Sequence, residues 1–103
     1  MWRLSGGLLS TTPVSKGATV TPGAPVTISA NQGSNGIAWV VQYDTSVLRA
    51  YDATNLGTEL YNTNQNATRD QPSTVVKYSE AMIANGRVYV GTKTQLVVYG
   101  LLP

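Results

Sequence analysis

Few side chains in this sequence are able to act as acids, bases, nucleophiles or metal ligands. The 103-residue chain has no cysteine and no histidine, which removes disulfides, thiolate and imidazole chemistry, and the usual zinc and haem ligands. A serine or threonine nucleophile would need a lysine or carboxylate base, and none stands in a recognised spacing. The five carboxylates lie at predicted turns and strand ends, which does not favour a glycosidase pair: Asp44, Asp52, Glu59, Asp70 and Glu80. We therefore expect no enzyme activity and assign no catalytic, cofactor-binding or metal-binding residue.

Four residues are candidates for contact with a ligand or partner. Tyr43 and Asp44 lie at a predicted hairpin turn, where an aromatic ring and a carboxylate stand side by side. Arg69 and Asp70 are adjacent in a long connection, where a structural ion pair or loop anchor is the competing interpretation. Asp52 opens the segment DATNLG, which predicts a turn closed by its own side chain, with metal binding as a weaker alternative.

The composition of the chain limits the classes of partner that it is expected to bind. The formal net charge is +2, and the seven basic residues are scattered, so we expect no nucleic-acid partner. No apolar run approaches the roughly 18 residues of a membrane span, and the first ten residues do not read as a signal peptide. These features predict a soluble protein without a membrane partner, and they leave its compartment unknown.

The elements that must position these residues are strands. Helical spacing is almost absent, while β-branched and aromatic residues are interrupted every few positions by Gly, Asn, Asp, Ser and Pro. Two longer connections, residues 13–24 and 63–74, are predicted to be irregular. The predicted strands are residues 7–12, 25–30, 37–42, 47–51, 59–62, 79–84, 87–92 and 95–101.

Two of the predicted hairpins repeat one another. Residues 35–52 align with residues 85–100, and the second hairpin loop is two residues shorter than the first. The period is 50 before the loop and 48 after it. Matched pairs are Gly36 and Gly86, Trp39 and Tyr89, Val40 and Val90, Leu48 and Leu96, and Tyr51 and Tyr99.

Both faces of the repeated hairpins are apolar, which distinguishes them from a sheet with one face in water. Four-stranded repeats of about 40–50 residues are typical of β-propeller blades, whose middle strands are covered on both sides. The sequence therefore predicts an all-β fold with about two four-stranded antiparallel blades per chain. A two-sheet sandwich is the alternative, but it does not explain the repeat. Four aromatic residues at matching strand positions are expected to pack between blades rather than to stack on sugars: Trp39, Tyr51, Tyr89 and Tyr99.

The segments ANGRVYVGTKTQLVVYG and VLRAYDATNLGTELYNT resemble the pyrroloquinoline-quinone-like β-propeller repeat family. Its blades carry a pattern close to Ala-Asn-Gly-(Lys/Arg)-Val-Tyr-Val-Gly-Thr followed by Leu-x-Ala-Tyr-Asp. The resemblance implies propeller blades, and resembling proteins are often exported. Ala81 stands where the pattern has a proline. Quinoprotein dehydrogenases of this class bind quinone and calcium through residues spread over a full ring, so no cofactor is carried over to this chain.

Under this interpretation, residues 1–103 form one propeller segment. Residues 1–24 supply the fourth strand of an adjoining blade and a connection, residues 25–62 form a complete blade, and residues 75–103 form a second blade without its fourth strand. Two blades cannot close a ring, so we expect the strand at 7–12 and the strand at 95–101 to pair between chains, or with further blades of a longer propeller of which this sequence is a fragment.

The predicted function is that of a structural or binding module. A two-blade unit of this kind would complete its ring by oligomerisation, with itself as partner in about three or four copies, and would present a surface to a carbohydrate or protein. One alternative is a lectin-like carbohydrate-binding propeller. The second is a non-catalytic fragment of a quinoprotein-type enzyme.

Overall fold

The computed structural model describes residues 1–18 and 23–101. Residues 19–22 of the predicted first connection, and 102–103 of the predicted second blade, lie outside the described residues. In the described part, strands alternate with turns and one helical connection. In chain order, the elements are β1 (Leu4–Ser5), β2 (Leu8–Leu9), β3 (Val26–Asn31), β4 (Ser34–Gln42), β5 (Val47–Asp52), β6 (Asn55–Asn62), η1 (Thr63–Asn66), α1 (Ala67–Asp70), β7 (Met82–Ala84), β8 (Arg87–Gly91) and β9 (Leu96–Tyr99).

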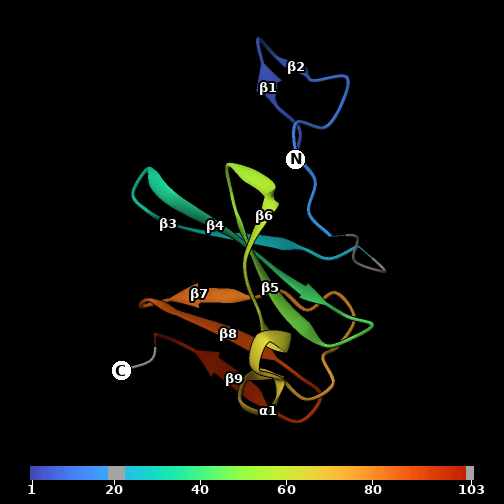
Figure 1. The fold of residues 1–103 in the computed structure, drawn as a ribbon, viewed down its shortest axis with the longest axis vertical. Coiled ribbons are helices and arrows are strands. Elements are labelled where there is room, and N and C mark those ends of the chain that lie inside the picture. The colour runs from blue at the N-terminus through green and yellow to red at the C-terminus, as the bar shows by residue number, and fades with distance from the viewer. Residues whose placement is uncertain (19–22, 102–103) are drawn as a thin grey trace.

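The strands form three antiparallel sheets, which confirms the prediction of a chain dominated by β-structure. β1 and β2 form a small hairpin, β3 to β6 form a four-stranded sheet, and β7 to β9 form a three-stranded sheet. Within each sheet the strands follow one another in chain order (Figure 1). The four-stranded sheet spans residues 26–62, and the three-stranded sheet spans residues 82–99.

Short polar turns set the register of the hairpins. Between β7 and β8, Asn85 and Gly86 have φ angles of 49° and 69°, the left-handed pair that a tight hairpin turn requires. Between β5 and β6, the Asp52 carboxylate accepts from the backbone N–H of Thr54 at 2.7 Å and from its hydroxyl at 2.6 Å. The predicted side-chain turn at Asp52 is therefore confirmed.

The single strand predicted at residues 7–12 is wrong. Gly6 and Gly7 adopt φ angles of 57° and 79° and reverse the chain, so that Leu4 pairs with Leu9 in a hairpin of two-residue strands. A Gly-Gly pair accepts such angles without steric cost, and here this preference prevails over strand formation. In Figure 1 the hairpin stands apart from both larger sheets.

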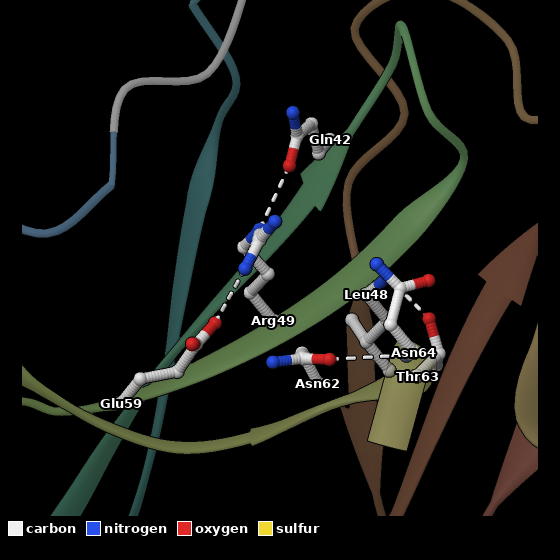
Figure 2. A network of polar contacts seen from close by, with 7 residues as sticks. All are labelled: Gln42, Leu48, Arg49, Glu59, Asn62, Thr63 and Asn64. Atoms are coloured by element: carbon white, nitrogen blue, oxygen red, sulfur yellow. Dashed lines mark hydrogen bonds and ion pairs between the residues drawn. The ribbon is translucent and has the colours of Figure 1, made fainter. Parts of the chain in front are cut away.

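The connection after β6 is partly helical, where an irregular loop was expected. The Asn62 side chain caps the first turn by accepting from the backbone N–H of Asn64 at 3.0 Å (Figure 2). Next to it, the buried Thr63 hydroxyl accepts from the backbone N–H of Leu48 at 3.3 Å. These two contacts fix the start of the connection against β5.

The main core lies between the two larger sheets. β4 and β5 contribute Val41 and Leu48, and β8 contributes Val88 and Val90. Val75 and Ala81, from the chain that leads into β7, fill the same core. The inner face of each sheet is therefore covered by the other sheet and by this connection.

The opposite face of the four-stranded sheet is covered in part by the segment that precedes β3. Ala38, Val40 and Tyr51 are buried there, with Ala24 and Leu56 packed against them. We call this side of the sheet the Tyr51 face. It also carries a polar row, in which the Arg49 guanidinium donates to Gln42 and to Glu59, each at 2.7 Å (Figure 2).

Candidate functional site

The four predicted packing aromatics lie on three different surfaces. Trp39 and Tyr99 pack against the core between the larger sheets, and the Trp39 indole N–H donates to the Ser29 hydroxyl at 2.8 Å. Tyr51 is buried on the Tyr51 face. Tyr89 is half-buried and belongs to the side of the three-stranded sheet that faces away from the core.

That side of the three-stranded sheet presents an exposed apolar surface. The strand register places Tyr89 opposite Met82 and Val98, and Leu96 opposite Gly91, all on the face that alternates with the buried Val88 and Val90. We call it the Tyr89 face, made of Met82, Tyr89, Leu96 and Val98. Three of these side chains are exposed: Met82, Leu96 and Val98.

The repeat gives two residues of the Tyr89 face, Leu96 and Val98, buried counterparts in the four-stranded sheet. Leu48 is 0% exposed, whereas its counterpart Leu96 is 65% exposed. Ala50 is 2% exposed, whereas Val98 is 48% exposed. The counterparts are buried because the three-stranded sheet covers them, while in the described chain no sheet covers the Tyr89 face.

The Tyr51 face also has an uncovered apolar part. Val26 pairs with Val40, and Ile28 pairs with Ala38, so both side chains point to this face. Both are exposed, in contrast to the buried residues with which they pair. The two sheets thus expose apolar side chains on opposite outer sides of the molecule.

A groove with a volume of about 1030 Å³ opens between the larger sheets beside β9. Its apolar walls include Trp39, Ile83 and Val97, and its polar end carries Arg69 and Asp70. The two predicted contact residues form an ion pair, in which the Arg69 Nη2 atom donates to Asp70 at 2.7 Å. The expected structural ion pair is therefore confirmed.

Asp70 joins three elements at the polar end of the groove. Its carboxylate accepts from the Tyr61 hydroxyl on β6 at 2.8 Å, and its backbone carbonyl accepts from the Tyr99 hydroxyl on β9 at 2.8 Å. Hydrogen bonding from Arg69 holds the pKa of Asp70 down to about 2. Burial, together with the Asp70 charge, raises the pKa of Tyr99 to about 12 and also raises the pKa of Tyr61. Arg69 and the hydroxyls of Tyr61 and Tyr99 already donate to Asp70, so these four residues link the two larger sheets. We call this cluster the Asp70 clamp.

Tyr43 and Asp44 lie elsewhere, in a polar hollow of about 510 Å³ at the β4–β5 turn. The hollow is closed by residues 71–74, where Gln71 donates to the Thr45 carbonyl at 3.1 Å. Both predicted residues are exposed, and within the described chain no hydrogen bond is formed by the Asp44 carboxylate. The structure therefore separates the four candidates into two pairs.

The described residues offer little for metal or membrane chemistry. Across residues 1–18 and 23–101, no three acidic side chains gather in a way that would hold a metal ion. Within the same ranges, no helix is both long and apolar enough to cross a membrane.

Two components of these sites could not be identified from the sequence. Tyr61 lies nine residues before its partner Asp70, and only the helical turns between them bring the two together. The Tyr89 face was recognisable as apolar from its alternation, but its exposure depends on which face the other sheet covers.

Comparisons of the chain with protein-family models, curated proteins and solved structures found no match.

Proposed function

We propose that this chain is a two-blade β-propeller unit whose function is self-assembly, with the Tyr89 face of one copy packed on the Tyr51 face of the next. The observation that carries the proposal is the contrast between Leu96 and its buried repeat counterpart Leu48. A sheet that exposes the equivalent of a fully buried leucine is suited to a contact of the same kind as the internal one.

The strand connections support blades rather than a sandwich. Each of the two larger sheets is built from consecutive strands, without a strand that crosses from one sheet to the other. Sandwiches of the immunoglobulin type use Greek-key connections between their two sheets. Consecutive strands within each sheet, repeated along the chain, are typical of propeller blades.

The internal contact supplies the geometry of the proposed external one. Inside the chain, the face that carries Trp39, Val41 and Leu48 meets the face that carries Val88, Val90 and Tyr99. The repeat relates the first face to the Tyr89 face and relates the second to the Tyr51 face. A head-to-tail contact between copies would therefore reproduce the internal contact.

Head-to-tail contacts close into rings when the rotation per copy divides the circle. Propellers have about four to eight blades, which for two-blade chains corresponds to about two to four copies. We favour about three or four copies, because the propeller family that the sequence resembles builds larger rings.

The test replaces one side chain of the Tyr89 face by a charge. Val98→Glu buries a carboxylate in the proposed contact and should reduce the assembly to single chains, measured as mass by light scattering. Val76→Glu is the control, because Val76 is a 43% exposed valine in the connection before β7, outside the strands that carry the two faces. We expect this control to keep the mass of the unmodified chain.

A sharp mass of several copies for the unmodified chain, lost only in Val98→Glu, would support the proposal. A stable folded monomer with cooperative melting would overturn it. Equal masses for the two variants would place the contact on another surface and would also overturn it.

The other two functions have less support. For carbohydrate binding, the Tyr61 hydroxyl already donates to the Asp70 carboxylate, and the Tyr99 hydroxyl already donates to the Asp70 backbone carbonyl. No single contact favours a sugar over this internal arrangement. A quinoprotein fragment would need residues from blades beyond these two sheets.

A further inference from the structure

We propose that β2 of one copy pairs with the outer edge of β9 in a second copy, and so supplies the fourth strand of the three-stranded sheet. The inference rests on the proposed self-assembly and names the elements that complete it. The ligand of the groove beside β9 is thus a segment of the same protein.

The first observation is the unequal size of the two sheets. β3 lies against β7, so the first strands of the two sheets are together. At the opposite edge of the four-stranded sheet, β6 pairs with β5. At the corresponding edge of the three-stranded sheet, β9 has β8 as its only partner among the described strands. Tyr61 on β6 and residues 97–101 beside it line the groove. The groove is therefore the space that a strand paired with β9 would border.

An unpaired strand edge carries backbone N–H and C=O groups that can accept another strand. The apolar lining from Trp39, Ile83, Val88 and Val97 suits a segment with leucine side chains. This lining would disfavour a highly charged peptide.

The second observation is the N-terminal hairpin. Leu4, Leu8 and Leu9 are all exposed, and the two strands of this hairpin have only two residues each. Isolated two-stranded hairpins are marginally stable in water, and exposed leucines on such a hairpin favour docking. The segment that carries the hairpin is closed at its base, because the amino group of Met1 donates to the Ser15 carbonyl at 2.7 Å.

The hairpin of one chain does not lie near its own β9. Figure 1 shows the hairpin and α1 at opposite ends of the longest axis, and β9 lies near α1. The occupant of the groove is therefore assigned to a second copy.

Chain order identifies the same segment. Within the chain, β6 is followed by a connection and then by β7, the first strand of the next sheet. In the same way, β2 is followed by a connection and then by β3. Suppose that a second copy places its four-stranded sheet on the Tyr89 face of the first. The β2 strand of the second copy then comes just before the sheet that covers this face, as β6 comes just before the three-stranded sheet within one chain. Since β6 pairs with β5, β2 of the second copy would pair with β9 of the first.

The experiment uses disulfide formation between copies, because the chain has no cysteine of its own. One preparation carries Val97→Cys, on the groove side of β9. The other preparation carries Leu8→Cys, Leu9→Cys or the control Leu4→Cys. The preparations are mixed, oxidised and analysed for the mixed dimer by non-reducing electrophoresis and mass spectrometry. Light scattering of the unmodified chain is recorded in parallel.

Neighbouring side chains in a strand point to opposite faces, and directly opposed pairs suit disulfide geometry. We therefore expect the mixed dimer to be the main product for one of Leu8→Cys and Leu9→Cys, and to be absent for the other and for Leu4→Cys. Circular dichroism of each variant verifies that it is folded.

The outcomes separate this inference from the proposed function. If the unmodified chain assembles but neither β2 variant forms the mixed dimer, the pairing is wrong and the self-assembly stands. Equal cross-linking by all three variants also overturns the pairing. A monomeric unmodified chain without cross-links overturns both, and a monomeric chain that still cross-links through one β2 position supports the pairing while overturning the ring.

Discussion

At the scale of single residues, Asp70 is the side chain whose charge has the clearest structural role. Arg69 and Tyr61 both donate to its carboxylate, and the resulting hydrogen bonds favour the ionised form. The Asp70 pKa is lowered from 3.8 to about 2, with hydrogen bonding from Arg69 as the largest cause. A depressed pKa in the folded state means that ionisation of this group stabilises the fold.

The first prediction follows from the sign of this shift. The contribution of Asp70 should be fully present above its unfolded-state pKa, near 4, and should disappear as the pH falls through about 2. We expect Asp70→Asn to lower the free energy of unfolding at neutral pH. We also expect the difference from the unmodified chain to shrink between about pH 4 and pH 2. Urea unfolding at a series of pH values measures this difference.

Asp44→Asn is the matched control, because Asp44 is exposed and its carboxylate accepts no hydrogen bond from the described residues. It should leave the free energy of unfolding nearly unchanged at each pH. An equal effect of the two substitutions would mean that the change in net charge, and not the Asp70 clamp, causes the loss of stability.

Sequence reasoning found part of this clamp. Adjacent opposite charges were sufficient to predict the Arg69–Asp70 ion pair. The contribution of Tyr61 was not predictable, because residues 63–70 were expected to be irregular and their helical turns determine where Asp70 lies. Tyr43 and Asp44 were correctly placed at a turn, but the sequence did not show that this turn is remote from the groove.

At the scale of elements, the turn between β7 and β8 allows a direct test of backbone conformation. Gly86 has a φ angle of 69°, which residues with a side chain adopt at a cost of roughly 1–2 kcal/mol. We therefore expect Gly86→Ala to lower the free energy of unfolding by about this amount. Denaturant titration followed by tryptophan fluorescence measures the change.

Gly33→Ala is the control for this substitution. Gly33 lies in the turn between β3 and β4, its φ is outside the left-handed region, and an added Cβ would meet no atom within 4 Å. Alanine there should be neutral or stabilising by up to about 1 kcal/mol, because it restricts the unfolded chain. Similar losses at both positions would contradict the conformational explanation.

The same turn chemistry explains which elements could be predicted. The Asn85–Gly86 pair and the Asp52 side-chain turn are local, so their residues alone identify them. At Gly6–Gly7 the turn preference of glycine competed with the strand preference of Leu8 and Leu9, and the strand was wrongly preferred. The short helix at Ala67–Asp70 has no apolar periodicity by which to recognise it.

At the scale of the whole molecule, the repeat correctly predicted two similar antiparallel sheets, because matched residues occupy matched register positions. The arrangement of sheets around a ring stays a prediction, since the described chain contains one contact between the two larger sheets. Contacts of one copy with another leave only an indirect sign in a sequence, namely an apolar face without a partner in its own chain.

The last prediction concerns the dependence of thermal stability on protein concentration. If the Tyr89 face is covered by a second copy, only the folded chain assembles, and mass action stabilises it as concentration rises. A tenfold rise changes the free energy of one contact by about 1.4 kcal/mol, so we expect the Tm to increase by roughly 5 °C, as measured by calorimetry. Val98→Glu should melt at a Tm independent of concentration, whereas Val76→Glu should follow the unmodified chain. A constant Tm for the unmodified chain across the range in which light scattering reports several copies would show that assembly does not contribute to its stability.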